Sequence, residues 1–184
     1  MGISRSEAAS ALTDIESTAG RSRLLRGYHY AAPILMLWGL IWAVGYTAMG
    51  LLATNRWGLI WLVLDIVGVV STILLSRRGQ GAARGGQTWK ILAGCGAVAA
   101  FCAAVFAMFQ PTSREAALAF PGLMTGLVYA GAGIAWAPRY LWIGAALFAA
   151  SLVGFFVFQP WLAYWMAAAG GGALFVSGLW LRRA

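Results

Sequence analysis

The stretch from Trp57 to Ser76 reads WGLIWLVLDIVGVVSTILLS, and the fold can be predicted outward from it. It is long and apolar enough to cross a bilayer as one helix, because about 20 predominantly apolar residues span the hydrocarbon core. Asp65 lies near its middle and is the only charged residue in the interior of any hydrophobic run of the chain. A carboxylate at this depth costs roughly 3 kcal/mol on insertion scales, so we expect Asp65 to have a polar partner or a function.

The composition of the whole chain indicates a membrane protein with several spans. Of its 184 residues, 61% are hydrophobic and only 10% are charged, whereas about a quarter of the residues of a soluble domain are charged. The formal net charge is +8, but the basic residues lie between the apolar runs and not along one basic face. This distribution is typical of topology signals and argues against nucleic-acid binding.

Six apolar runs follow a polar head, and each is close to the length that a spanning helix requires. Residues 1–29 are predicted to form a cytoplasmic head, in which a short amphipathic helix ends near Gly20. The head closes with Arg21, Arg23 and Arg26, which we expect to bind anionic lipid headgroups. Residues 30–184 form the predicted transmembrane domain, an all-α fold of six helices at 30–53, 57–76, 89–109, 116–136, 140–158 and 161–181.

The positions of the basic residues predict how the chain is threaded. If residue 1 is cytoplasmic and the chain crosses six times, only Arg56 and Arg114 of the thirteen basic residues fall on the outer side. Such an excess of Lys and Arg on the inner side is the positive-inside pattern. We therefore predict a multi-pass protein of the cytoplasmic (inner) membrane with both termini in the cytoplasm. Its Ala-, Gly- and Arg-rich composition favours a bacterial source.

Similar segments suggest that the spans form three hairpin repeats. Phe109-Gln110-Pro111 ends the third run, and Phe158-Gln159-Pro160 ends the fifth. The tryptophans at the outer ends of the second and sixth runs also correspond, as do the arginine pairs at their inner ends. With a proline at each turn, the last two hairpins are similar to those of six-helix membrane proteins of the HdeD type. We transfer no residue role from this resemblance.

A polar site around Asp65 is predicted from depth and spacing. At about 1.5 Å per residue, Tyr46 and Thr47 of the first run come to a depth similar to that of Asp65. One of their hydroxyls is therefore expected to bind the carboxyl. Gly68 and Thr72 follow Asp65 at helical spacing, so this face is expected to point inward. Two interpretations remain open, a proton or cation site and a hydrogen-bonded packing group.

Small residues at helical spacing predict where helices come close together. We predict packing positions at Gly68, Gly122, Gly126 and Gly171, because small side chains let two backbones approach in a membrane. Gly171 belongs to a run of three glycines. Such a run either unwinds the helix locally and lines a binding site, or permits a tight crossing.

Few residues in the sequence indicate ligand binding or catalysis. Most tryptophans lie at span ends, as in an aromatic belt, but Trp38 and Trp42 are deeper and are the best candidates for a lipid or cofactor contact. His29 is the only histidine and has no cysteine or carboxylate partners nearby, so no metal site is predicted. The sequence contains neither Gly-x-Ser-x-Gly nor His-Glu-x-x-His. We therefore predict no catalytic residue, no cofactor and no enzyme activity.

The leading functional hypothesis is a non-enzymatic membrane protein that acts through helix association, as an accessory, assembly or sensory subunit of a membrane complex. Its partners would be the lipid bilayer and a membrane or cytoplasmic protein, or further copies of the chain. The single intramembrane charge and the many small-residue faces motivate this hypothesis. The alternative is a small transporter or channel for a proton, cation or small solute, with Asp65 as its coupling or selectivity residue.

Overall fold

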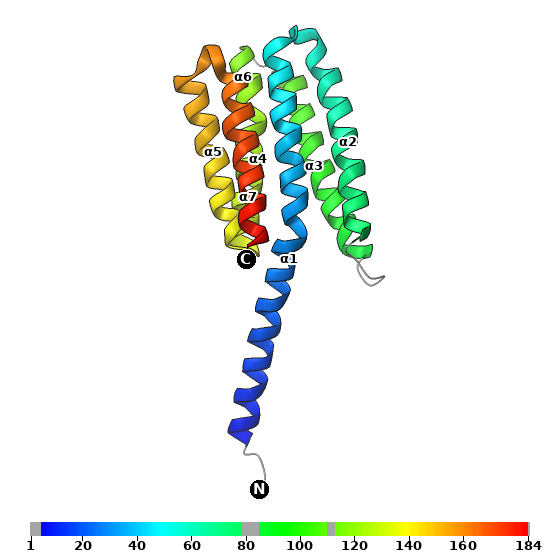
Figure 1. The fold of residues 1–184 in the computed structure, drawn as a ribbon, viewed down its shortest axis with the longest axis vertical. Helices are drawn as coiled ribbons and strands as arrows, with labels where there is room; N and C mark the ends of the chain where they lie inside the picture. The colour runs from blue at the N-terminus through cyan, green and yellow to red at the C-terminus, as the bar shows by residue number, and fades with distance from the viewer. Residues whose placement is uncertain (1–4, 79–84, 110–112, 184) are drawn as a thin grey trace.

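The computed structural model describes residues 5–78, 85–109 and 113–183, and every regular element in these ranges is helical. The all-helical fold is therefore confirmed. Figure 1 shows the helices side by side in one bundle. The helices are α1 (Arg5–Leu51), α2 (Trp57–Arg78), α3 (Gly85–Phe109), α4 (Arg114–Ala135) and α5 (Arg139–Val157), followed by α6 (Leu162–Trp165), the π-helix η4 (Met166–Gly171) and α7 (Gly172–Arg182).

Among the residues that the structure describes, five helical stretches are long and apolar enough to cross a membrane. Short 3-10 turns, η1 (Thr54–Arg56) and η3 (Gln159–Trp161), join α1 to α2 and α5 to α6. Within α3 the apolar stretch Gly96–Phe109 is shorter than the other five. The five long stretches are Ser10–Leu51, Thr54–Ser76, Arg114–Ala135, Arg139–Val157 and Gln159–Arg182.

The first helix is much longer than expected. A separate head helix ending near Gly20 was the wrong expectation, because α1 runs unbroken over 47 residues, about 70 Å at 1.5 Å per residue. A glycine inside a helix costs only about 1 kcal/mol, so Gly20 alone does not end it. Residues 5–27 of α1, here called the N-terminal arm, project beyond the bundle (Figure 1). From Ser10 onward, Tyr28 is the first buried residue of α1.

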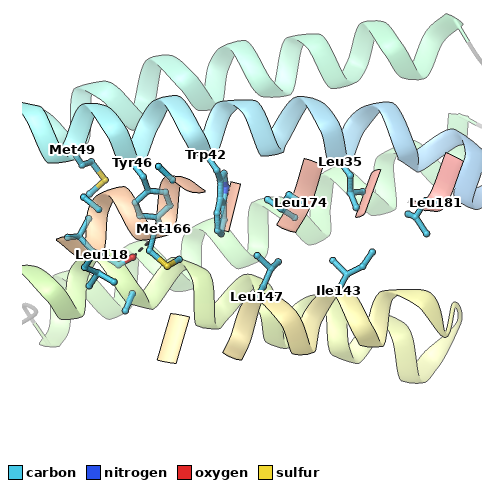
Figure 2. Close-up of a cluster of buried hydrophobic side chains, with 14 of the residues drawn as sticks. Leu35, Trp42, Tyr46, Met49, Leu118, Ile143, Leu147, Met166, Leu174 and Leu181 are labelled. Carbon is cyan, nitrogen blue, oxygen red and sulfur yellow. Dashed lines mark hydrogen bonds between the residues drawn. The ribbon is translucent and has the colours of Figure 1, made fainter. Parts of the chain in front are cut away.

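The core lies between two closely packed helix pairs, α4 with α5 and α1 with the continuous η4–α7 stretch. Figure 2 shows side chains from α1, α4, α5, η4 and α7 meeting in this core, among them Tyr46, Leu147, Met166, Leu174 and Leu181. The second helix is peripheral. Only 6% of its most apolar window is buried inside the chain, against 44% for the last span.

Two arginines fasten the first turns of α4 and α5 to the ends of neighbouring helices. Arg114 Nη2 donates to Met49 O (3.1 Å) near the end of α1, and its guanidinium lies 5.2 Å from the Trp57 ring centroid. Arg139 Nη1 donates to Trp180 O (3.3 Å) near the end of α7 and lies over the Trp180 ring. Cations are favourable there because the last carbonyls of a helix carry partial negative charge.

We expect Arg139→Gln to lower the free energy of unfolding by about 1 kcal/mol, since the cation–π contacts with Tyr28 and Trp180 and a charged hydrogen bond are lost at a partly exposed site. The control is Arg182→Gln, which removes an exposed arginine at the end of α7. Thermal unfolding of the detergent-solubilised protein, followed by tryptophan fluorescence, measures both variants. Equal losses in the two would contradict the role given to Arg139.

Candidate functional site

Asp65 lies at the edge of the side of α2 that faces α1, and its side chain is exposed. Its neighbours do face α1. A Cβ atom at Gly68 would lie 2.8 Å from Trp38 Cη2, and Trp38 Nε1 donates to Thr72 Oγ1 at 3.2 Å. The expectation that Asp65 points inward is therefore wrong. Four residues of an α-helix turn about 40° more than one full turn. Because the contact between α1 and α2 is narrow, this extra rotation leaves Asp65 outside it.

The hydroxyls that were expected to bind Asp65 have other acceptors. Tyr46 Oη donates to Leu118 O at 3.1 Å, and Thr47 Oγ1 donates to Ala43 O at 2.7 Å. Asp65 makes no hydrogen bond or ion pair with any residue that the structure describes. The predicted polar layer around Asp65 is therefore not formed within the described ranges.

Tyr46 is fully buried and links three helices. Its hydroxyl donates to Leu118 O in α4, in the turn before Pro121. The Tyr46 ring packs edge-to-face against Trp42 (centroids 5.6 Å apart) and against Trp61 of α2 (5.4 Å). Figure 2 shows Tyr46 reaching from α1 towards Leu118.

The two deep tryptophans, Trp38 and Trp42, pack between helices. Trp42 is 7% exposed, and a Cβ atom at Gly170 would lie 3.3 Å from its ring. Trp38 is partly buried between α1 and α2, with its indole N–H bound to Thr72. The structure thus gives both rings packing contacts with neighbouring helices, and the lipid or cofactor contact stays a prediction.

Of the four glycines singled out in the sequence, Gly126 and Gly171 lie where helix backbones approach, whereas the nearest atoms to a Cβ at Gly68 and Gly122 belong to side chains. A Cβ atom at Gly126 would lie 2.9 Å from Gly144 O of α5, and Gly122 faces α5 along the same crossing. A Cβ atom at Gly171 would lie 2.8 Å from Gly39 O of α1. Both crossings therefore depend on the absence of a side chain, since small residues let membrane helices pack closely.

An apolar cavity of about 260 Å³ lies between α1, α2, α3 and α4. The indole N–H groups in its lining are bound elsewhere, Trp57 Nε1 to Leu52 O and Trp61 Nε1 to Met49 Sδ. Trp57 and Trp61 had suggested only an aromatic belt, and the sequence gives no sign of the α3 side chain that completes the site. The lining residues are Tyr46, Met49, Trp57, Gly58, Trp61, Phe106, Ala117 and Pro121.

The three arginines proposed to bind headgroups are exposed on the N-terminal arm. Arg23 Nε donates to Ala19 O and Arg26 Nε to Ser22 O, each four residues back along α1. These bonds use one N–H of each guanidinium and leave the others available to a headgroup. No group of three or more His, Cys, Asp or Glu among the described residues could hold a metal ion.

Comparisons with known protein families, curated proteins and solved structures find no match to this chain. The resemblance of the last two hairpins to HdeD-type proteins is thus not supported by a family match. The function has to be inferred from the chain's own residues, chiefly Asp65 and the cavity beside Tyr46.

Proposed function

We propose that this protein is a non-enzymatic, multi-pass membrane protein that acts through helix association, as an accessory, assembly or sensory subunit of a membrane complex. The observation that carries the proposal is the exposed carboxyl of Asp65 in the middle of α2. A charged side chain facing lipid costs roughly 3 kcal/mol, and a polar partner offsets part of that cost. Because the described part of the chain offers Asp65 no partner, we place the partner on another protein.

The contact surface that we propose is a stripe of α2 formed by Leu62, Asp65 and Val69. These residues follow at i, i+3 and i+7, so they share one face of the helix. Leu62 is 58% and Val69 41% exposed. A symmetric second copy would place two Asp65 carboxylates together, and like charges disfavour each other. A different helix with a basic or hydroxyl side chain complements the stripe better.

The orientation that we propose follows the positive-inside pattern, with six crossings, three hairpin repeats and both termini in the cytoplasm of a bacterial cell. The N-terminal arm would then lie on the cytoplasmic side. Leu12 and Ile15 on the arm are 60% and 65% exposed, and they offer an apolar contact to a cytoplasmic segment of the partner.

A photo-crosslinking residue at Val69 is expected to form an adduct with a partner protein in native membranes. Val67 is the matched control, because it is an exposed valine of the same helix, about 200° away around the axis. Asp65→Leu should lower the Val69 adduct about threefold or more, since interhelical hydrogen bonds in membranes contribute about 0.6–2 kcal/mol. Asp65→Asn, which keeps a hydrogen-bonding group, should retain more adduct than Asp65→Leu. Equal adducts at Val67 and Val69, or an adduct that survives Asp65→Leu, would contradict the proposal.

The same variants separate this function from transport. A transport site at Asp65 would need a second chain to enclose it, because the carboxyl lies on the outside of this one. If the purified protein in liposomes moves protons or cations and Asp65→Asn abolishes the flux, transport replaces helix association as the role of Asp65. We expect no flux in either form.

A further inference from the structure

The lining of the cavity beside Tyr46 suits an apolar occupant. Its lining consists of ring faces, a thioether and small aliphatic groups, and the Tyr46 hydroxyl is already bound to Leu118 O. A buried water needs about two to four polar partners, which such a lining does not supply. An apolar cavity of about 150 Å³ holds a benzene molecule, so 260 Å³ accommodates several methylene groups. Acyl chains are the apolar molecules that surround any membrane-spanning helix.

A positive charge that has no ion pair among the described residues lies against two of the residues that line this cavity. The Arg114 guanidinium lies over Trp57 and donates to Met49 O, and both of these residues line the cavity. Arg114 forms no ion pair with any carboxylate that the structure describes, including the adjacent Glu115. A guanidinium has five N–H donors, so most of them remain available. Arg56, directly before Trp57, adds a second exposed cation at this end.

We propose that the cavity binds one acyl chain of an anionic phospholipid whose phosphate is held by Arg114. Arginine binds phosphate through paired N–H donors, and the aromatic ring beneath it keeps the guanidinium in a fixed plane. This also accounts for a feature of the charge pattern. Arg56 and Arg114, the two basic residues that the threading places on the outer side, both lie next to Trp57.

The chain part of the proposal is tested by filling the cavity from Gly58. This glycine lines the cavity, and a Cβ atom there would meet no atom within 4 Å, so a larger side chain can enter without distorting the helix. The series Gly58→Ala, Gly58→Val and Gly58→Leu removes increasing volume. The matched control is Gly131→Leu, at an exposed glycine of α4 that is equally unobstructed and lies outside the lining.

The full chain in mild detergent is mixed with equal amounts of dioleoyl phosphatidylglycerol and dioleoyl phosphatidylcholine, and retained lipids are counted by native mass spectrometry. We expect wild type and Gly131→Leu to retain one phosphatidylglycerol preferentially. Retention should fall stepwise along the Gly58 series, by about tenfold for Gly58→Leu, because overfilling a packed site weakens binding by that order. Unchanged retention in Gly58→Leu, or a retained apolar molecule other than phospholipid, would overturn the proposal.

The headgroup part is tested at Arg114. Arg114→Lys keeps a charge and should keep the preference for phosphatidylglycerol, whereas Arg114→Gln should bind the two lipids about equally. Arg56→Gln should weaken the preference less than Arg114→Gln. Because all three variants leave the cavity open, total lipid retention should change little, and this separates loss of headgroup binding from loss of fold. A preference for phosphatidylglycerol that persists in Arg114→Gln would show that Arg114 does not hold the phosphate.

Discussion

Gly144→Ala is expected to destabilise the bundle by about 2–3 kcal/mol, the upper part of the range of about 1–3 kcal/mol found when a packed core is overfilled. A Cβ atom at Gly144 would overlap the backbone nitrogen of Ala130 and lie 2.5 Å from Gly126 O. Backbone atoms cannot rotate away as a flexible side chain does, so α4 and α5 would have to separate. In a bilayer this separation forfeits van der Waals packing, which is a main source of helix association there.

The matched control is Gly131→Ala on α4. No atom lies within 4 Å of a Cβ atom at Gly131, so this variant should keep or slightly raise stability, because alanine favours helix by up to about 1 kcal/mol over glycine. Thermal unfolding in detergent compares the two variants. If both unfold at the same temperature as the wild type, α4 and α5 are not packed as closely as the structure shows.

The second large effect is expected within the run Gly170–Gly172, where three adjacent glycines have different surroundings. A Cβ atom at Gly171 would lie 2.8 Å from Gly39 O and 2.9 Å from the Ala43 nitrogen, both backbone atoms of α1. At Gly170 the nearest atom is a side-chain carbon of Trp42, at 3.3 Å. At Gly172 no atom lies within 4 Å. Alanine should therefore cost about 2–3 kcal/mol at position 171, much less at 170 and nothing at 172.

This series distinguishes a tight crossing from local unwinding. If the glycines served to unwind the helix, alanine would stabilise the helix at all three positions, because it has the higher helix propensity. The structure instead places a π-helix from Met166 to Gly171 and then a regular α-helix. Denaturation of the three variants by sodium dodecyl sulfate, followed by circular dichroism, ranks their stabilities. A ranking other than 171, 170, 172 in decreasing loss would contradict the crossing.

The elements of this fold could be predicted because their signals are local. Apolar runs of spanning length, separated by Arg, Gly and Pro, mark helices wherever they occur. The signal for the start of α4 is equally local, because the Ser113 side chain caps the helix: its Oγ accepts a hydrogen bond from Ala116 N. The extent of α1 was missed because Gly20 was taken to end a helix, whereas a helix tolerates a glycine at a cost of about 1 kcal/mol.

The orientation of Asp65 could not be predicted, for a reason specific to membranes. In a soluble helix the polar face marks the outside, but in a bilayer both the lipid-facing and the core-facing sides are apolar. The pattern of α2 therefore does not show which side meets α1. The cavity was missed for a related reason. It needs Phe106 of α3 beside Trp57 of α2, and the sequence does not state which helices are neighbours.

The continuity of α1 has a mechanical consequence. Consecutive turns of a helix are joined by hydrogen bonds, so a rotation applied at one end reaches the other as torque and is not lost in a loop. Pro33 is the proline inside α1. It lacks the N–H that would bond to His29 O, so bending is concentrated near the base of the N-terminal arm. A movement of the N-terminal arm is thus transmitted along α1 to Trp42 and Tyr46, the residues through which α1 contacts η4 and α4.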